Sequence, residues 1–157
     1  MEHGRPIQIM QRLPQGGFYQ AQARSGPAIA TTSGDQIHVA LRSSVQGDDT
    51  LRTTTLSAGQ TDFRGVKWTE LRTGLTNASP ALLTDNIGIP RLVIRGLDNA
   101  PWYASWRNGA WSGFTKFSND QLASAPGLYR NSESQIRFYG ASPSNQIISR
   151  PVLPNSW

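Results

Sequence analysis

Cysteine is absent from the 157 residues, so disulfides, thiolate nucleophiles and cysteine-ligated metal sites are excluded. No run of about 18 apolar residues, the length that a membrane-spanning helix needs, occurs either. The N-terminal MEHGRPIQ lacks the basic and apolar segments of a signal peptide. We therefore expect a soluble chain without membrane insertion, and we expect packing alone to stabilise it.

Lysine is scarce: two of the 15 basic residues, Lys67 and Lys116, are lysines. Arginine thus dominates the net charge of +5. Its planar guanidinium suits anions, sugar hydroxyls and stacking on aromatic faces. The arginines are scattered singly and form no basic stripe, so a nucleic-acid partner is not indicated.

Features that would indicate catalysis are also missing. His3 and His38 are isolated and show no metal-ligand or triad spacing. Most of the ten acidic residues stand in turn contexts, and none form a recognisable pair of the kind that glycoside hydrolysis needs. No phosphate-binding glycine loop occurs. We expect no enzyme, metal or cofactor; a propeller glycoside hydrolase is the less favoured alternative.

Glycine and proline are abundant, with 15 and 10 residues, as expected for many short strands joined by turns. The tetrads GPAI, SPAL and APGL place Pro27, Pro80 and Pro126 at spacings of 53 and 46 residues. Each tetrad starts a similar series of short apolar segments separated by turns, and the middle series contains four segments. A repeat of this length with four strands predicts an all-β fold of β-propeller blades, each made of four antiparallel strands.

The repeat divides the single domain, residues 1–157, into unequal parts. Residues 1–24 form a starting fragment, 25–76 and 77–122 form whole blades, and 123–157 form a blade of three strands that lacks its last one. A closed ring needs about four to eight blades. We therefore expect a homo-oligomer, as a dimer, in which the neighbour's N-terminal GGFYQAQ supplies the missing strand. A fragment of a longer propeller is the alternative.

The segment PWYASWRNGAWSGFTKF, residues 101–117, concentrates the aromatic residues. We expect Trp106, Phe114 and Trp68 to pack between blades, and the tryptophans beside turns to face a ligand. A pyranose stacks on an aromatic ring and bonds to polar side chains through its hydroxyls. The candidate binding residues are Arg95, Asp98, Asn99, Trp102, Trp106 and Trp111.

Arg95 stands inside an apolar strand and therefore needs a partner. Asp85, Asp98 and a ligand are the three possibilities. Turn formation is the competing explanation for Asp98 and Asn99.

The stretch LVIRGLDNAPWYASWRNGAWSGFTKF resembles the blades of the Photorhabdus-type propeller lectins, relatives of the tectonin-like proteins. The match is good over residues 79–117 and partial elsewhere; Arg42 and Tyr139 take the place of Arg95, and Leu51 and Gln146 that of Trp102. The resemblance implies a calcium-independent lectin that binds glycans, fucose or O-methylated sugars, in pockets between adjacent blades. A protein-interaction propeller without sugar binding is the main alternative.

Overall fold

The computed structural model describes residues 7–12, 18–23, 25–32, 34–43, 45–60, 63 and 65–152, with side chains from residue 25 onward. The remaining residues of the expected starting fragment, 1–6, 13–17 and 24, lie outside this described part, as do 153–157. Across the described residues every regular element is a strand, and no helix capable of crossing a membrane occurs among them.

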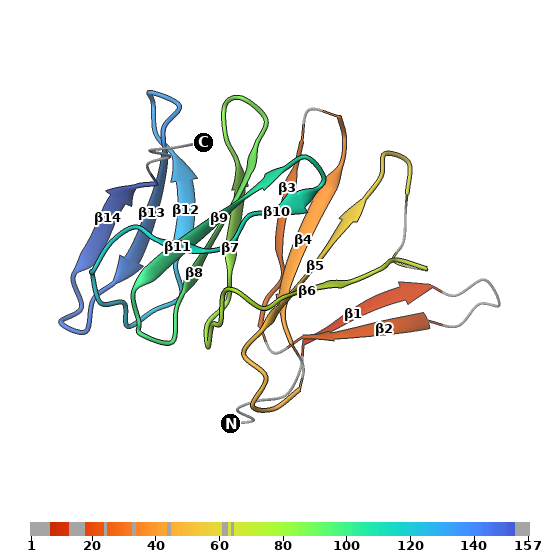
Figure 1. Ribbon diagram of the computed structural model, residues 1–157, viewed down its shortest axis with the longest axis horizontal. Helices are drawn as coiled ribbons and strands as arrows, with labels where there is room; N and C mark the ends of the chain where they lie inside the picture. Colours follow the sequence, from red (N-terminus) through yellow and green to blue (C-terminus); the bar gives the residue numbers. More distant parts are fainter. Residues whose placement is uncertain are drawn as a thin grey trace.

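The strands form four antiparallel sheets in chain order (Figure 1). The first is a hairpin of β1 (Ile7–Arg12) and β2 (Phe18–Ala23). The second contains β3 (Ala28–Thr31), β4 (Ile37–Arg42), β5 (Leu51–Leu56) and β6 (Thr69–Leu71). The third contains β7 (Ala81–Thr84), β8 (Pro90–Arg95), β9 (Pro101–Arg107), and an outer strand in two pieces, β10 (Ala110–Trp111) and β11 (Thr115–Lys116). The last contains β12 (Gly127–Arg130), β13 (Ile136–Ala141) and β14 (Ile147–Pro151).

Five reversals between strands share one geometry. In each, the amide of the first residue donates to the carbonyl of the fifth, and the amide of the fourth donates to the carbonyl of the first. The fourth residue has a positive φ, which glycine, asparagine and aspartate tolerate best. These residues are Asp35, Gly88, Asn99, Ser134 and Asn145. A three-residue loop with such a bulge fixes the hairpin register, so successive sheets repeat the same pairing.

The pairing register confirms the repeat. Ala28, Ala81 and Gly127 occupy equivalent positions, paired with Ala40, Val93 and Tyr139, and they are spaced 53 and 46 residues apart, as the prolines are. We call the last three sheets the first, second and third blades. The all-β fold with antiparallel blades of about four strands is as predicted.

The register corrects three of the expected equivalences. Arg42 does occupy the position of Arg95, but Ala141 rather than Tyr139 does so in the third blade. The position of Trp102 is taken by Arg52 and Ile148, and not by Leu51 and Gln146. The turn that begins at Gly96 corresponds to the one that begins at Ser142, so Gly140 occupies the position of Ile94 although it shares its residue type with Gly96.

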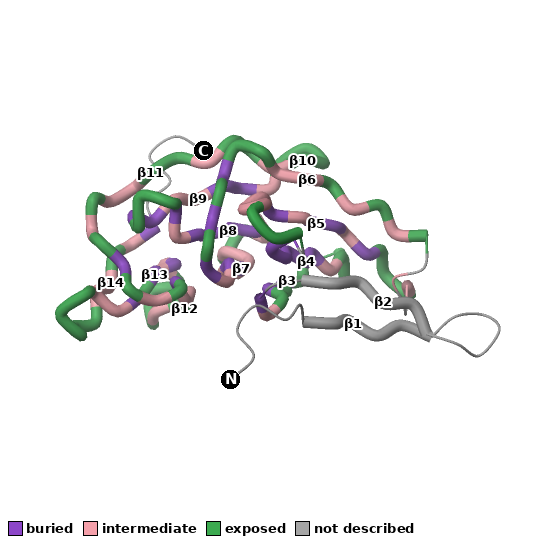
Figure 2. Tube along the Cα trace, turned by 90° about the horizontal axis from the view of Figure 1, so that it is seen from below, coloured by how far each residue is buried: buried purple, intermediate pink, exposed green. Residues whose placement is uncertain are grey.

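The three blades stand side by side, with their first strands adjacent along the inner side of an arc (Figure 2). Side chains connect the ends of these inner strands: the Thr84 hydroxyl donates to the Thr31 carbonyl at 2.6 Å, and the Arg130 guanidinium donates to the Thr84 carbonyl. These three residues are repeat equivalents. Inner strands that meet along one line while outer strands diverge are the arrangement of propeller blades around an axis.

The core lies between blades. Ala40 and Leu51 of the first blade pack against Leu92 and Ile94 of the second, and each of these side chains is at most 1% exposed. The opposite face of the second blade, centred on Val93, packs against the third blade in a separate cluster. Burial on both faces explains why β8 is almost continuously apolar.

We predict that Gly74→Ala destabilises the fold. A Cβ at this position would lie 2.2 Å from the Phe114 ring, which packs on the core between the first and second blades. Overpacking of this kind costs about 1–3 kcal/mol. Gly113→Ala is the matched control, because a Cβ there meets no atom within 4 Å. Urea unfolding of both variants tests this, and equal stability of the two would contradict it.

Candidate functional site

The six candidate residues separate into two groups along β9. Trp102 and Trp106 lie on the face toward the first blade, whereas Tyr103 and Ser105 lie on the face toward the third, as strand alternation predicts. Trp106 and Trp111 gather at the β9–β10 hairpin. Trp102 stands near the other end of the strand, together with Arg95, Asp98 and Asn99.

The first group lines a cavity of about 340 Å³ between the first and second blades, which we call the first cleft. Asn108 and Gly109 both have positive φ and form a two-residue hairpin turn, which places Trp111 opposite Trp106 in the ladder. Their rings meet edge to face with centroids 5.6 Å apart. The remaining lining residues are Thr53, Thr54, Thr55, Thr69, Leu71, Gly109 and Ala110.

His38 of β4 lies beneath the two tryptophans. It is 1% exposed, and its ring centroid is 4.8 Å from that of Trp106 and 6.1 Å from that of Trp111. Its Nδ1 is 3.2 Å from the Thr55 hydroxyl, while Nε2 has no hydrogen-bond partner among the described residues. Burial lowers the pKa of His38, so the imidazole is neutral at neutral pH.

The first cleft is therefore an uncharged site. Two indoles offer apolar faces, and threonine hydroxyls on β5 and β6 can donate and accept hydrogen bonds. No Asp, Glu, Lys or Arg is among the described residues that line it. No group of three or more metal-ligating side chains occurs elsewhere in the described part of the chain either. This combination suits a neutral ligand that has both an apolar face and hydroxyl groups.

Asp98 and Trp102 of the second group line a smaller cavity of about 280 Å³, the turn pocket, together with the 73–75 segment, Ile94, Gly96 and Leu97; Arg95 and Asn99 are not among its lining residues. Trp102 Nε1 donates to Asp98 Oδ1 at 3.0 Å, and Lys116 Nζ lies 3.1 Å from Asp98 Oδ2. Desolvation opposes ionisation of Asp98, but hydrogen bonds from Trp102 and the Ala100 amide, together with Lys116, lower its pKa. Gly96 permits this arrangement, since a Cβ there would lie 2.6 Å from Trp102 Nε1.

The protein partner of Arg95 is neither of the expected aspartates. Its Nε and Nη2 donate to Asn77 Oδ1 at 3.3 and 2.9 Å. Asp85 instead holds Arg91 in a buried ion pair at 2.6 Å. Asn77 belongs to the connection between the first and second blades, so residue spacing along the strand did not identify it as the partner of Arg95.

Asn99 has a structural role in the turn between β8 and β9. Its φ is 64°, its amide donates to the Gly96 carbonyl at 2.9 Å, and its carbonyl accepts from the Leu122 amide at 2.8 Å. One packing expectation agrees with the structure, since Phe114 packs on the core between the first two blades. Trp68 stacks on Phe63, with ring centroids 6.0 Å apart, in a cluster of first-blade residues alone, so its packing between blades stays a prediction.

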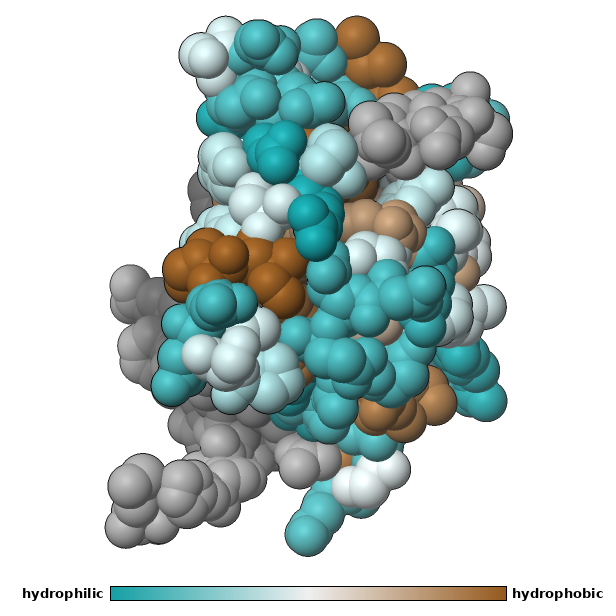
Figure 3. Space-filling model, turned by 90° about the vertical axis from the view of Figure 1, so that its left-hand side faces the viewer, coloured by the Kyte–Doolittle hydropathy of each residue, from teal (hydrophilic) through white to brown (hydrophobic). Residues whose placement is uncertain are grey.

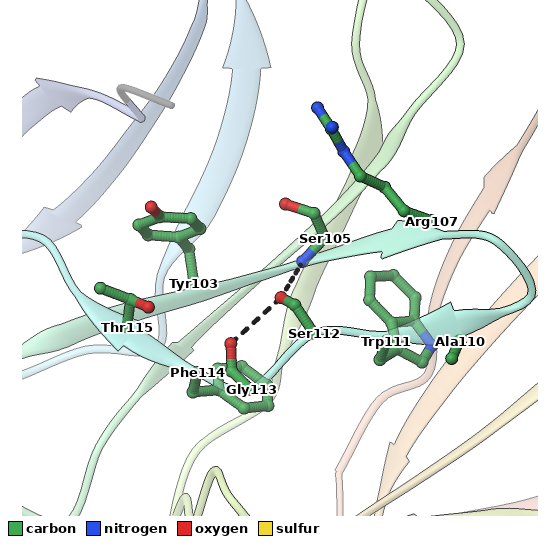
Figure 4. Close-up of a pocket in the computed structure, with 9 residues that line it drawn as sticks. All are labelled: Tyr103, Ser105, Arg107, Ala110, Trp111, Ser112, Gly113, Phe114 and Thr115. Carbon is green, nitrogen blue, oxygen red and sulfur yellow. Dashed lines mark hydrogen bonds between the residues drawn. The ribbon is translucent and has the colours of Figure 1, made fainter. Parts of the chain in front are cut away.

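A cavity of about 540 Å³, the second cleft, lies along the interrupted outer strand of the second blade, and its lining includes Trp111 and Phe114 as well as side chains of the face toward the third blade (Figure 4). Tyr103, Ser105 and Thr115 form its wall, and they are the repeat equivalents of Thr53, Thr55 and Thr69 in the first cleft. The Ser112 hydroxyl accepts from the Ser105 amide at 3.0 Å, where the outer strand is interrupted between β10 and β11.

Arg91 takes the place of His38 beside this second wall. It is 3% exposed, and its Nη1 donates to the Ser105 hydroxyl at 2.7 Å, as His38 meets Thr55. In the third blade the equivalent residue is Arg137, whose Nε donates to the Ser149 hydroxyl at 3.2 Å. His38, Arg91 and Arg137 thus stand at equivalent positions, and each contacts a hydroxyl of the next strand in its own blade. The sequence contained one sign that His38 matters: His38 and Arg91 both occupy the second position of their strands.

Solved structures share this fold at low sequence identity. A fucose lectin from Kordia zhangzhouensis in complex with methyl-fucoside has a TM-score of 0.54 at 17% identity, over 84% of this chain and 95% of that chain. A fucose-specific lectin from Aleuria aurantia has a TM-score of 0.63 at 9% identity, over 99% of this chain and 51% of that chain. AofleA from Arthrobotrys oligospora has a TM-score of 0.57 at 10% identity, over 99% and 52%. The chain therefore spans about half the length of the latter two.

These likenesses show the fold, which is that of part of a β-propeller. No family model matches the sequence, and no curated protein matches it.

We predict that His38 makes the stability of the fold depend on pH. Its pKa in the folded protein lies below the ordinary value of 6.5, so the unfolded chain binds the proton more readily. Stability is then full above about pH 6.5 and falls as the pH decreases toward the folded pKa. Urea unfolding at pH 7 and pH 5 should show a smaller loss in His38→Gln than in the unmodified protein. Parallel losses would mean that His38 does not stay neutral.

Proposed function

We propose that this chain is a lectin that binds neutral glycans in the first cleft. The observation that carries the proposal is the placement of Trp106 and Trp111 over a wall of threonine hydroxyls, with a buried neutral histidine beneath. The apolar CH face of a pyranose packs on an indole, while its hydroxyls need donors and acceptors at the edge. Both requirements are met within one uncharged cavity.

Fucose or an O-methylated sugar is the ligand class that we propose. The Kordia and Aleuria proteins are named as fucose lectins, and their shared fold supports the choice. A methyl substituent adds apolar surface, which the Trp106 and Trp111 rings and the Leu71 side chain can bury.

The proposed activity is binding without catalysis. Glycoside hydrolysis needs two carboxyl groups on either side of one glycosidic bond. The first cleft presents none among its described lining residues. In the turn pocket, the side chain of Asp98 is occupied by Trp102 and Lys116.

Among the candidate residues, we propose that Trp106 and Trp111 contact the sugar directly. Trp102 and Asp98 line the turn pocket, which is our second candidate site, and Arg95 and Asn99 flank it in the chain. It is more apolar, and hydrogen bonds within the protein engage the Asp98 carboxylate and the Arg95 guanidinium.

The two sites are distinguished by a matched pair of variants. Trp111→Ala should weaken binding of methyl-fucoside at least tenfold, or about 1.4 kcal/mol, because it removes the stacking surface. Trp102→Ala should leave the affinity within about twofold, which is well below that difference. Isothermal titration calorimetry measures both, with circular dichroism to confirm folding. The reverse order of effects would move the sugar to the turn pocket, and no binding by the unmodified protein would favour a protein-interaction scaffold.

We also propose that a second copy covers the outer face of the third blade. This face exposes Tyr129, Tyr139 and Ile147 at 38%, 45% and 75%. Figure 3 views the molecule from this side, where apolar patches interrupt the polar surface. The residues equivalent to Tyr139 are Ala40 and Val93, both 0% exposed beneath the following blade. A dimer of two three-bladed chains would bury this face, with the neighbour's N-terminal segment supplying a strand.

Light scattering tests the assembly. The unmodified chain of 17.2 kDa should have about twice that mass in solution. Tyr139→Asp should shift the mass to that of one chain, because it places a charge in the interface. Ile87→Asp is the control, since Ile87 is 70% exposed in the turn between β7 and β8. A monomeric unmodified protein would contradict the proposal.

A further inference from the structure

The first cleft has a buried titratable group beneath it that the proposed sugar contacts do not use. His38 is not among the lining residues of the cavity; it is 1% exposed and lies under Trp106 and Trp111. We infer that this arrangement is a proton-operated switch. The β9–β10 hairpin covers a neutral His38 when the cleft is ready for sugar, and protonation of His38 displaces the hairpin and releases the sugar. The inference rests on the proposed function, because it concerns regulation of the same site.

The hydrogen bonds of His38 provide for a neutral ring and not for a charged one. Nδ1 is 3.2 Å from the Thr55 hydroxyl, which can donate to it. Nε2 is buried and has no partner among the described residues. An imidazolium donates from both nitrogens, so it would need an acceptor at each. A buried charged donor without an acceptor is far more costly than a neutral one, and exposure to water removes that cost.

The surroundings of His38 offer no opposite charge either. The strands packed around it present neutral side chains, namely Ala30 of β3, Thr55 of β5, Trp106 of β9 and Trp111 of β10. The indole rings stand edge to face with the imidazole, at interplanar angles of 62° and 80°. Contacts of this kind hold a neutral ring in place and supply no carboxylate to an imidazolium.

Two ion pairs share this interface between blades, and both lie toward the other end of the strands. Arg42 stands four residues from His38, about 13 Å along β4, and its Nη2 is 3.6 Å from Asp49. Lys116 lies over the Trp102 ring, and its Nζ is 3.1 Å from Asp98. Their carboxylates are therefore engaged with other cations.

The remaining charged side chains of the neighbouring elements do not face His38 from these strands. Asp35 and Lys67 are exposed in the loops before β4 and β6, where water screens their charges. The others alternate to the opposite sheet faces: Arg52, Glu70, Arg91 and Arg107. Within the described part of the chain, an imidazolium at His38 is thus uncompensated while the hairpin covers it.

The cover is easier to move than the histidine. β4 is a central strand, paired with β3 on one side and with β5 on the other, whereas β10 is a two-residue strand at the edge of its sheet. It pairs with β9 through Ala110 and Trp111, and the outer strand is interrupted before β11 (Figure 4). Displacement of β10 takes Trp111 with it. The sugar site then loses one of its two aromatic faces.

The direction of the pH effect follows from burial. The covered His38 has a pKa below the ordinary value of 6.5, so the covered state is neutral at pH 7 and loses ground to an open state as the pH falls below about 6.5. A sugar that needs the hairpin in place stabilises the covered state. By linkage, binding of the sugar must therefore lower the pKa of His38 further.

Calorimetric titration with methyl-fucoside at pH 7.5 and pH 5.0 tests the switch. An open-state pKa of 6.5 limits the loss of affinity to about thirtyfold at pH 5.0, and we expect at least about fivefold. In His38→Gln, which cannot titrate there, the two affinities should agree within about twofold. His3→Gln removes the other histidine of the chain and is the matched control, which should keep the full loss. Circular dichroism confirms the fold at both pH values.

The outcomes separate the switch from the sugar site itself. An affinity of the unmodified protein that does not change with pH, or an equal loss in His38→Gln, overturns the inference and leaves the proposed function standing. No binding at pH 7.5 contradicts the proposed function instead, and a measurement without sugar then decides on the switch.

Nuclear magnetic resonance of His3→Gln supplies that measurement, because His38 is then the single histidine. Its ring signal should titrate with a pKa below 6.5, and the indole signal of Trp111, assigned with Trp111→Phe, should shift with the same midpoint. Added methyl-fucoside should move both midpoints to lower pH. An indole signal that does not follow the imidazole titration means that the hairpin stays in place, and an imidazole midpoint at 6.5 or above means that His38 is not covered; either result overturns the inference.

Discussion

The contact between neighbouring blades is the interaction on which this structure depends. Ala40 and Leu51 on one side and Leu92 and Ile94 on the other exclude water almost completely. No blade could bury enough apolar surface alone, because each sheet has two faces and the second blade needs both covered. This packing fixes the distance between blades, and with it the depth of each cleft. The sites are therefore consequences of the core rather than additions to it.

Repetition of one hairpin geometry turns this packing into a series of comparable clefts. The same bulged turn recurs with Asp35, Gly88, Asn99, Ser134 or Asn145 at its positive-φ position, and it keeps the strands in one register. Equivalent positions then differ in chemistry without differing in place. His38, Arg91 and Arg137 stand at one such position, each bonded to a hydroxyl. A neutral imidazole beside two tryptophans makes the first cleft uncharged, whereas an arginine takes that place in the second.

The fold was predictable from the sequence because its determinants are local. Alternating strands, turn residues and the spacing of Pro27, Pro80 and Pro126 predicted antiparallel blades, and the pairing register agrees. The equivalences predicted for Tyr139, Leu51 and Gln146 were wrong, because strand pairing, and not similarity of residue type, sets the register. The sequence repeat aligned the blades correctly at positions that strand pairing fixes, such as Ala28, Ala81 and Gly127.

The candidate site was predictable only in part, since it joins side chains from two blades. Trp106 and Trp111 stand out as aromatic residues beside a hairpin turn, but nothing local links them to His38 or Thr55, which come from the preceding blade. The partner of Arg95 was missed for the same reason, because Asn77 lies in the connection between blades. Such pairings arise from packing between blades and become visible when the blades are placed together.

The central claim is that the first cleft holds a sugar, and a crystal structure of the protein with methyl-fucoside tests it most directly. The account predicts density for the pyranose against the Trp106 and Trp111 rings, with its hydroxyls within hydrogen-bonding distance of threonines on β5 and β6. Sugar density in the turn pocket beside Trp102, with the first cleft empty, would contradict it.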